Sequence, residues 1–282
     1  MLGRTLQREL AGNEIVVADL PDWDVTDADG FMGRTLAAAP DAVVHCAAMT
    51  KVDDCESNRE LAFRLNEEGS RNVALACKAC GARLIAISTD YVFSGEPPRE
   101  PWAWSETDIP RPRTVYGASK FAGEQMVQMI HPDNSVILRI AWLYGAGGPS
   151  FLHTMAKLGA REGAPLKVVD DQRGNPTSTK VVADVVKFLL ARPDVSGIVH
   201  GTCEDQCTWY GLAKELKRLL GASFPREVAP CATEEFPRPA PRPRNSALKK
   251  SVLNVLGYRT PRWQDALAEF VGSGEFDGIS DK

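Results

Sequence analysis

The 282-residue sequence lacks several features that mark whole classes of protein. It has no large surplus of one charge: 33 Lys and Arg against 37 Asp and Glu give a formal net charge of −4, which argues against nucleic acid or a membrane surface as a partner. No apolar run is long enough to span a bilayer, and no secretory leader is recognisable. We therefore expect a cytoplasmic globular protein with neither a membrane nor a nucleic-acid partner.

Cysteine and histidine are scattered without a disulfide or metal pattern. The seven cysteines are an odd number in a chain too long to need a disulfide scaffold, which favours reduced thiols. Cys77 and Cys80 have metal or redox spacing, but they end a helical run of small residues, which favours packing. A zinc site would need a second ligand pair, and Cys203 and Cys207 are only loose candidates. The four histidines show no ligand spacing, so we predict no metal site.

The glycine-rich turn that opens a dinucleotide-binding fold is also missing. The first ten residues already have a helical pattern, and only Gly3 could be the last glycine of such a turn. The next apolar run ends at Asp19, whose carboxylate could bond an adenosine ribose hydroxyl and would repel a 2′-phosphate. A surface aspartate that closes a strand explains Asp19 equally well. We expect the first strand and its phosphate-binding turn to be absent from this sequence.

What the sequence does contain is an alternation of apolar strands and helical segments. Buried strands are predicted over 15–19, 42–46, 84–88 and 136–140. Helices are predicted over 27–39, 58–80 and 115–130. Ser57 and Glu60 have the spacing of a capping box for the second helix. Apolar strands that alternate with helices are typical of an α/β fold, here a Rossmann-like, doubly wound parallel sheet whose first strand is missing.

After about residue 146 the alternation loosens, which predicts a smaller C-terminal substrate-binding lobe. Helices near 151–162 and 180–191 and a strand at 166–169 are predicted there. We expect a dinucleotide-binding domain over 1–145, onto which 178–202 packs back, a lobe made of 146–177 and 203–261, and a C-terminal helix and tail over 262–282.

Residues 237–244, the proline-rich arm, alternate proline with arginine or alanine and precede Asn245. As composition, the arm is consistent with a polyproline linker or an SH3-type ligand. It is equally consistent with a rigid cationic wall of a pocket, its arginines facing phosphate oxygens. The residues alone leave both interpretations open.

Ligands of a doubly wound sheet bind at the carboxyl ends of its strands, so the residues that follow the predicted strands are site candidates. These residues are Ala47, Ala48, Met49 and Thr50, then Thr89 and Asp90, then Trp142. Tyr116 and Lys120 are four apart on one predicted helix face. An ammonium beside a phenol favours the phenolate, so we expect a lowered tyrosine pKa and a proton donor suited to a carbonyl being reduced.

Several motifs together make the chain closely similar, over essentially its whole length, to the dTDP-4-dehydrorhamnose reductases, a family of the extended short-chain dehydrogenase/reductase superfamily. They occupy residues 45–53, 88–93, 116–120, 141–145, 171–177 and 242–246. The last two motifs distinguish this family from the superfamily at large. The resemblance implies NADPH- or NADH-dependent reduction of the C4 ketone of dTDP-4-dehydro-L-rhamnose to dTDP-L-rhamnose.

The resemblance also implies roles for individual residues. Tyr116 would donate the proton, Lys120 would assist it and bond the nicotinamide ribose, and Thr89 would bond the reacting oxygen. The substrate would further contact Asp90, Trp142, Arg242 and Asn245, with the proline-rich arm closed over its nucleotide. The cofactor would lie against Gly3, Asp19, Asp24, Val25, Ala47, Ala48, Met49 and Thr50, besides Tyr116 and Lys120.

Two other interpretations stay open. Dehydratases of the superfamily place a glutamate after Thr-Asp, where this chain has Tyr91, which disfavours a nucleotide-sugar dehydratase or epimerase. Absence of the phosphate loop would suit a non-catalytic nucleotide-binding subunit similar to the regulatory subunit of methionine adenosyltransferase. Against it, Thr89, Tyr116 and Lys120 are all retained. NADH versus NADPH, and monomer versus homodimer, are left open.

The expected absence of a central strand has a consequence for stability. Neighbouring strands would lose ladder hydrogen bonds and expose apolar faces, at a cost of several kcal/mol against a total of about 5–15 kcal/mol. We therefore expect the chain as given to be markedly unstable or aggregation-prone when expressed alone. A single sharp, cooperative thermal transition in the ordinary mesophile range would contradict this.

Overall fold

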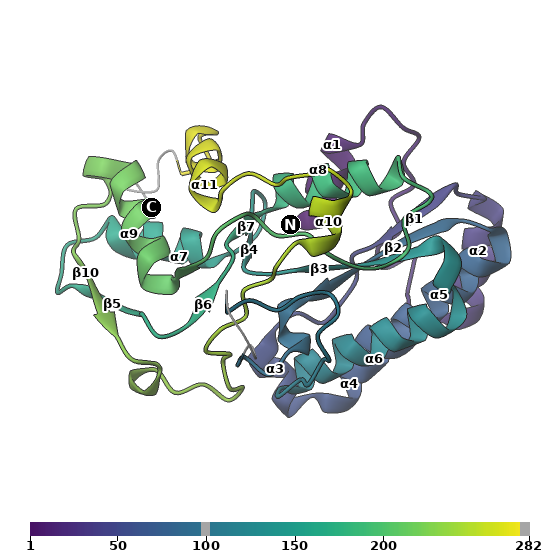
Figure 1. The fold of residues 1–282 in the computed structure, drawn as a ribbon, viewed down its shortest axis with the longest axis horizontal. Coiled ribbons are helices and arrows are strands. Elements are labelled where there is room, and N and C mark those ends of the chain that lie inside the picture. The colour runs from purple at the N-terminus through teal and green to yellow at the C-terminus, as the bar shows by residue number, and fades with distance from the viewer. Residues whose placement is uncertain (97–101, 277–282) are drawn as a thin grey trace.

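The computed structural model describes residues 1–96 and 102–276 and has a parallel four-stranded sheet at its centre (Figure 1). In spatial order the strands are β1 (Ala42–His45), β2 (Arg83–Thr89), β3 (Ser135–Ile140) and β8 (Gly197–His200). All six residues of β3 are buried, as expected for a central strand covered on both faces. The predicted α/β class with a parallel, Rossmann-like sheet is confirmed.

Helices cover both faces of this sheet (Figure 1). One face carries α2 (Ala28–Ala38), α5 (Gly69–Cys80) and α6 (Val115–Ile130), and the other carries α1 (Leu2–Glu9), α8 (Thr179–Leu190) and α10 (Ser251–Val255). Leu84 and Ile85, adjacent in β2, belong to different cores because successive strand side chains point to opposite faces. Leu84 packs with Cys77 of α5, and Ile85 packs with the valines of α8.

The connection from β1 to β2 is helical almost throughout. It consists of α3 (Val52–Ser57), α4 (Arg59–Phe63), one π-helical turn, η1 (Arg64–Glu68), and α5. The helix predicted over 58–80 is confirmed, but its predicted capping box is wrong. Ser57 is the last residue of α3, and its hydroxyl donates to the Asp54 carbonyl at 3.2 Å. The Asn58 N–H is bonded to that same carbonyl, so residues 57 and 58 continue the end of α3 instead of capping the next helix.

The second lobe lies beyond the sheet, on the left of Figure 1. It contains α7 (Phe151–Gly159), α9 (Trp209–Leu220), α11 (Trp263–Gly272) and a parallel pair of strands, β5 (Leu166–Val169) and β10 (Val228–Cys231). Its core includes Leu152, Leu212, Leu216 and Phe224.

Further elements are short: one lies in the turn between α6 and β3, and the others lie in the lobe or between it and the sheet. They are η3 (Pro132–Asn134), β4 (Leu143–Tyr144), β6 (Arg173–Gly174), β7 (Thr177–Ser178), β9 (Cys207–Thr208), η4 (Gly221–Ser223) and η5 (Thr233–Glu235). Strand β4 pairs with β7, and β6 pairs with β9. The predicted C-terminal segment 262–282 includes α11, but residues 277–282 lie outside the described part of the chain.

The strand predicted over 15–19 is wrong. These residues have no regular secondary structure, and Ile15, Val16 and Val17 are all exposed. A β-strand exists only through hydrogen bonds to a neighbouring strand. Within the described residues, β1 is an edge strand whose one partner is β2, and no strand pairs with 15–19. The apolar pattern identified a segment suited to a sheet but could not supply its partner.

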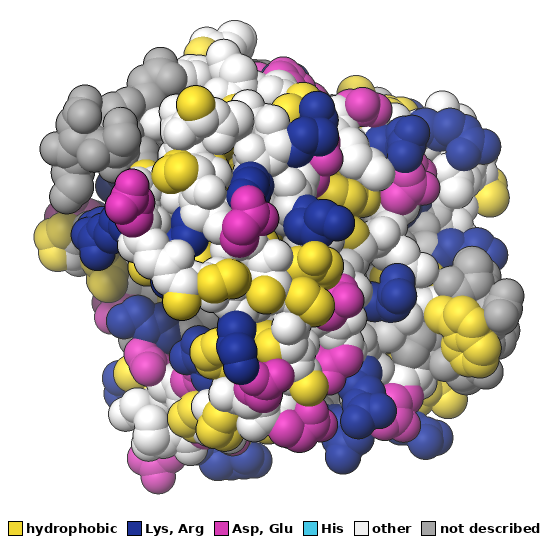
Figure 2. Space-filling model, turned by 90° about the vertical axis from the view of Figure 1, so that its left-hand side faces the viewer, with side chains coloured by type: hydrophobic (Ala, Val, Ile, Leu, Met, Phe, Trp, Pro, Cys, Tyr) yellow, Lys and Arg dark blue, Asp and Glu magenta, His cyan; other side chains and the backbone are white. Residues whose placement is uncertain are grey.

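The surface of the lobe carries both charge signs intermixed (Figure 2). Ion pairs contribute to this pattern, for example Arg218 with Glu215 at 2.6 Å and Lys167 with Glu235 at 2.6 Å. Such a mixed face gives no single-sign field for a polyanion. Among the described helices, none is both long and apolar enough to cross a membrane.

A buried ion pair joins helix α6 to the sheet. Arg139 of β3 donates two hydrogen bonds to Glu124 of α6, at 2.9 and 2.6 Å, and neither side chain is more than 2% exposed. Ser88 of β2 donates a further bond to the same carboxylate at 2.5 Å. One carboxylate therefore links the helix to two neighbouring strands.

Removing one charge of this pair should be costly. Glu124→Gln leaves the Arg139 guanidinium buried without its counter-ion, and we expect a loss of about 3–5 kcal/mol in the free energy of unfolding, measured by urea denaturation. The double variant Glu124→Leu/Arg139→Met removes both charges and should lose much less. Arg218→Gln, which breaks an exposed pair, is the matched control and should cost less than about 1 kcal/mol. A loss below 1 kcal/mol in Glu124→Gln would refute the anchoring role.

Candidate active site

The two residues with the Y-x-x-x-K spacing lie in the first turns of α6. The helix starts after Thr114, whose hydroxyl accepts a hydrogen bond from the Gly117 N–H at 3.0 Å. Tyr116 and Lys120 are both buried on the helix face toward β2. A Cβ at Gly117 would lie 2.2 Å from the Tyr91 carbonyl oxygen, so only glycine lets the helix approach the end of β2 this closely.

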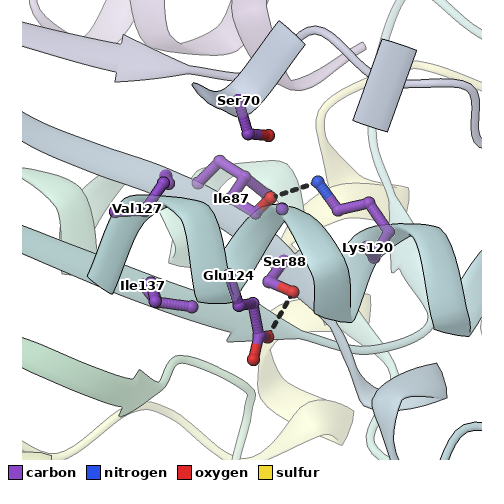
Figure 3. Close-up of a pocket in the computed structure, with 9 residues that line it drawn as sticks. Ser70, Ile87, Ser88, Lys120, Glu124, Val127 and Ile137 are labelled. Atoms are coloured by element: carbon purple, nitrogen blue, oxygen red, sulfur yellow. Dashed lines mark hydrogen bonds between the residues drawn. The ribbon is translucent and has the colours of Figure 1, made fainter. Parts of the chain in front are cut away.

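Lys120 reaches back to the sheet backbone. Its Nζ donates to the Ile87 carbonyl at 2.7 Å, as Figure 3 shows, beside the bond between Ser88 and Glu124. Burial lowers the pKa of Lys120 to about 8, opposed by the negative charge of Glu124. The space beneath it is a cavity of about 10 Å³, enough for one water at most. One of the three ammonium N–H groups is committed to the sheet, and the others remain available to a ligand.

The predicted lowering of the tyrosine pKa is wrong for this structure. Burial raises the pKa of the Tyr116 phenol, and a hydrogen bond with Thr89 only partly opposes that rise. The Lys120 ammonium, which the sequence pattern paired with this phenol, is bonded to the Ile87 carbonyl at 2.7 Å. Tyr116 is therefore a neutral phenol that keeps its proton at neutral pH.

Two polar residues at the end of β2 complete this cluster. Thr89 ends β2, and Asp90 opens a 3₁₀ turn, η2 (Asp90–Val92). The Thr89 hydroxyl donates to Asp90 Oδ1 at 3.0 Å, and contacts with Ser246 and Thr89 favour the charged form of this buried carboxyl. Burial raises the pKa of Asp90 to about 6. The Tyr91 and Tyr116 rings pack edge-on with centroids 5.6 Å apart. Because Thr89 is hydrogen-bonded to both Tyr116 and Asp90, these three residues form one connected site.

The predicted cofactor loop after β1 is held in place by Asn66, a residue the sequence reasoning missed. The Asn66 side chain accepts from the Met49 N–H at 2.8 Å and donates to the Met49 carbonyl at 3.1 Å. It also donates to the Ser119 hydroxyl of α6 at 2.9 Å. Ala47 and Thr50 of the same loop are exposed. A fully buried asparagine in the π-helical turn thus ties the loop to α6.

The other predicted cofactor residues lie around the start of the chain. Gly3 lies in the first turn of α1, where an added Cβ would meet nothing. Asp19 is exposed and accepts a hydrogen bond from the Leu20 N–H. Asp24 accepts hydrogen bonds from the N–H and the hydroxyl of Thr26, and these bonds lower the pKa of Asp24. Val25 is buried, and its carbonyl accepts from Asn72 of α5. No hydrogen bond within the described residues joins these four to Tyr116.

Trp142, predicted to line the sugar pocket, lies between the two lobes. Its backbone has a positive φ of 46°, and its ring stacks on Trp209 of α9 with centroids 3.5 Å apart. The stack covers one face of the Trp142 indole, and Gly174 crowds its edge so closely that a Cβ would lie 2.3 Å away. Trp142 can therefore present only its remaining surface to a ligand.

The proline-rich arm returns to α3. Arg242 binds Asp53 through both of its terminal nitrogens, at 2.9 and 2.8 Å, and this contact lowers the pKa of Asp53. Asn245 donates to the Trp102 carbonyl at 2.7 Å. The arm borders a cavity of about 180 Å³. Its lining includes Tyr91, Phe93, Arg113, Thr114, Arg242 and Arg244.

The buried Lys120 ammonium predicts an unusual stability effect. Its folded pKa of about 8 lies below the value of 10.5 for a free lysine, so between these pH values the unfolded chain binds more protons and stability rises with pH. At pH 7 the buried charge costs about 3 kcal/mol, and its hydrogen bond returns about 1 kcal/mol.

We expect the free energy of unfolding of Lys120→Met, measured by urea denaturation at pH 7, to exceed that of the parent by about 2 kcal/mol. This difference should become smaller by pH 10, where the lysine of the parent is neutral. Lys78→Met, at an exposed position on α5, should change little. Equal or lower stability of Lys120→Met at pH 7 would contradict the assignment of a buried charge.

Comparisons with known proteins agree on one family. The family model described as the RmlD substrate binding domain matches residues 1–275. A dTDP-4-dehydrorhamnose reductase from Streptomyces griseus is 43% identical over 276 residues, which cover 95% of this chain and 89% of that protein.

Two solved structures agree with the sequence comparisons. A dTDP-4-dehydrorhamnose reductase from Clostridium acetobutylicum superposes with a TM-score of 0.91 at 39% identity, covering 96% of this chain and 95% of that one. A second, from Bacillus anthracis and in complex with NADP, has a TM-score of 0.89 at 36% identity, with the same coverage. The motif resemblance is thus confirmed, and the chain belongs to the dTDP-4-dehydrorhamnose reductase family.

Proposed function

We propose that this protein reduces the C4 ketone of dTDP-4-dehydro-L-rhamnose to dTDP-L-rhamnose with NADPH or NADH. The observation that carries the proposal is the buried cluster of Tyr116, Lys120 and Thr89 at the carboxyl end of the parallel sheet, in a chain of this family. A neutral phenol, a hydroxyl and an ammonium in one place suit the conversion of a carbonyl to an alcohol.

The residues present fit a nicotinamide cofactor. Lys120 keeps N–H donors beyond its bond to Ile87, and Ala47 and Ala48 leave room for a flat ring beside the backbone. Lys120 and Tyr116 would hold the nicotinamide ribose, and the loop fixed by Asn66 would line the adenosine side. When bound, the reduced nicotinamide supplies the hydride. The Bacillus anthracis relative was solved with NADP, which supports NADPH as one donor.

The residues of the chain would stabilise the developing charge and supply the proton. As the carbonyl carbon is reduced, negative charge grows on its oxygen, and Tyr116 and Thr89 would stabilise that charge by hydrogen bonds. Tyr116 would then donate its phenolic proton, which burial keeps in place at neutral pH. Lys120, whose ammonium is bonded to the Ile87 carbonyl, would act by holding the cofactor rather than by shifting the pKa of the phenol.

The proposal extends to the setting of the enzyme. We infer that it acts in the cytoplasm, in line with seven cysteines that are all free thiols in the structure. Trp142 and Asp90 would contact the sugar, and Arg242 and Asn245 would border the nucleotide end of the site. A homodimer is proposed as the assembly to test, by sedimentation of the purified chain.

Tyr116→Phe tests the proposed acid. It removes the phenolic proton while keeping the ring, so we expect turnover to fall by about a hundredfold to ten-thousandfold with little change in substrate affinity. Turnover is followed as loss of reduced-nicotinamide absorbance, with NADPH and then NADH, in the presence of dTDP-4-dehydro-L-rhamnose. Tyr258→Phe, beside Phe188 and away from the site, is the matched control. Near-parental turnover in Tyr116→Phe would rule out the assignment.

A further inference from the structure

Asp53 holds the proline-rich arm against the catalytic half of the protein. Besides the two bonds from Arg242, its Oδ1 accepts from the Ala240 N–H at 3.2 Å. Arg242 also donates to the Ala240 carbonyl at 3.0 Å, which closes a compact loop in the arm around this contact. The two partners are 189 residues apart in sequence, so the contact exists only in the folded protein.

The helix that carries Asp53 is itself fixed to the catalytic helix. Glu56, one turn further along α3, accepts a hydrogen bond from the Val115 N–H at 2.9 Å, at the residue before Tyr116. Cys55, between them, is fully buried in the cluster that contains Tyr116. Helix α3 thus connects the arm to the first turn of α6 through two independent contacts.

The arm borders the cavity that lies next to the proposed catalytic cluster. Arm residues 241–244 form one side of the 180 Å³ cavity, and Tyr91 and Thr114 belong to its lining. Tyr91 packs on Tyr116, and Thr114 caps the helix that carries it. A displaced arm would remove one side of this cavity without touching Tyr116, Lys120 or Thr89.

Given the proposed function, we propose that Asp53 is a positioning residue of the reductase, which holds the arm closed along the nucleotide-sugar cavity through Arg242. Both terminal nitrogens of Arg242 donate hydrogen bonds to Asp53, so this ion pair attaches the arm to α3. Arg244, which borders the same cavity and whose charge also acts on Asp171, would meet the substrate's diphosphate.

The ion pair between Arg242 and Asp53 is expected to affect the position of the arm more than the global stability of the protein. The side chains of Arg242 and Asp53 are 21% and 27% exposed, and partly exposed pairs contribute little to global stability. The proposal therefore expects Asp53 variants to stay folded while the arm opens. Substrate binding should weaken, whereas the chemistry at Tyr116 should proceed once substrate is bound.

Steady-state kinetics of Asp53→Asn test this. We expect KM for the nucleotide sugar to rise about tenfold or more, as for loss of one charge-assisted contact, with kcat within about threefold and KM for the nicotinamide cofactor unchanged. The control is Asp54→Asn, at the adjacent and more exposed carboxylate, which should behave like the parent. The charge-swapped variant Asp53→Arg/Arg242→Asp should recover much of the lost affinity.

Limited trypsin digestion supplies a readout that does not need activity. Arg238 and Arg242 precede proline and resist trypsin, so cleavage in the arm reports on the bond between Arg244 and Asn245. Asp53→Asn should be cleaved there several-fold faster than the parent and Asp54→Asn, and the swap should restore protection. Unchanged KM and unchanged cleavage in Asp53→Asn would overturn the proposal. An inactive parent would count against the proposed function, and the digestion would still decide the role of Asp53.

Discussion

The buried contact between Arg139, Glu124 and Ser88 sets the position of α6, the helix that carries Tyr116 and Lys120. Two charges without solvent are tolerated only while they face each other, because an unpaired buried charge costs several kcal/mol. A slip of α6 by one turn along the sheet would break both hydrogen bonds from Arg139 and the bond from Ser88. The guanidinium also lies over the Phe93 ring at 5.0 Å, which restricts it further. The ion pair therefore specifies one register between helix and sheet.

The same register also fixes the positions of Tyr116 and Lys120, the two residues proposed to carry the reaction. Tyr116, Lys120 and Glu124 follow one another at intervals of four on one face of α6. Glu124 contacts Ser88, Lys120 contacts the carbonyl of Ile87, and Tyr116 contacts Thr89, so all three side chains meet the last three residues of β2. The ion pair that holds the helix on the sheet therefore also holds the two residues that we propose for the chemistry.

The sequence predicted the parts of the molecule whose signals are local. The apolar pattern found β2, β3 and α6, and the Tyr116–Lys120 spacing identified two side chains that the structure buries on the face of α6 toward β2. The strand predicted over 15–19 is wrong because strand formation needs a partner that no pattern in the segment itself can supply. The contacts of Asn66 with Ser119 and of Asp53 with Arg242 span 53 and 189 residues and leave no periodic trace. The direction of the Tyr116 pKa also depends on burial, which spacing does not report.

The Thr89 hydroxyl has a single hydrogen, and two acceptors compete for it. In the structure it donates to Asp90, yet its proposed role is to bond the oxygen of the ketone. The conflict is resolved if Asp90 carries a proton of its own, because the carboxyl can then donate to Thr89 and release the hydroxyl hydrogen toward the substrate. Burial shifts Asp90 toward this state by raising its pKa to about 6. Under the proposed function, the protonation of Asp90 would therefore set the direction of the hydrogen bond that Thr89 makes.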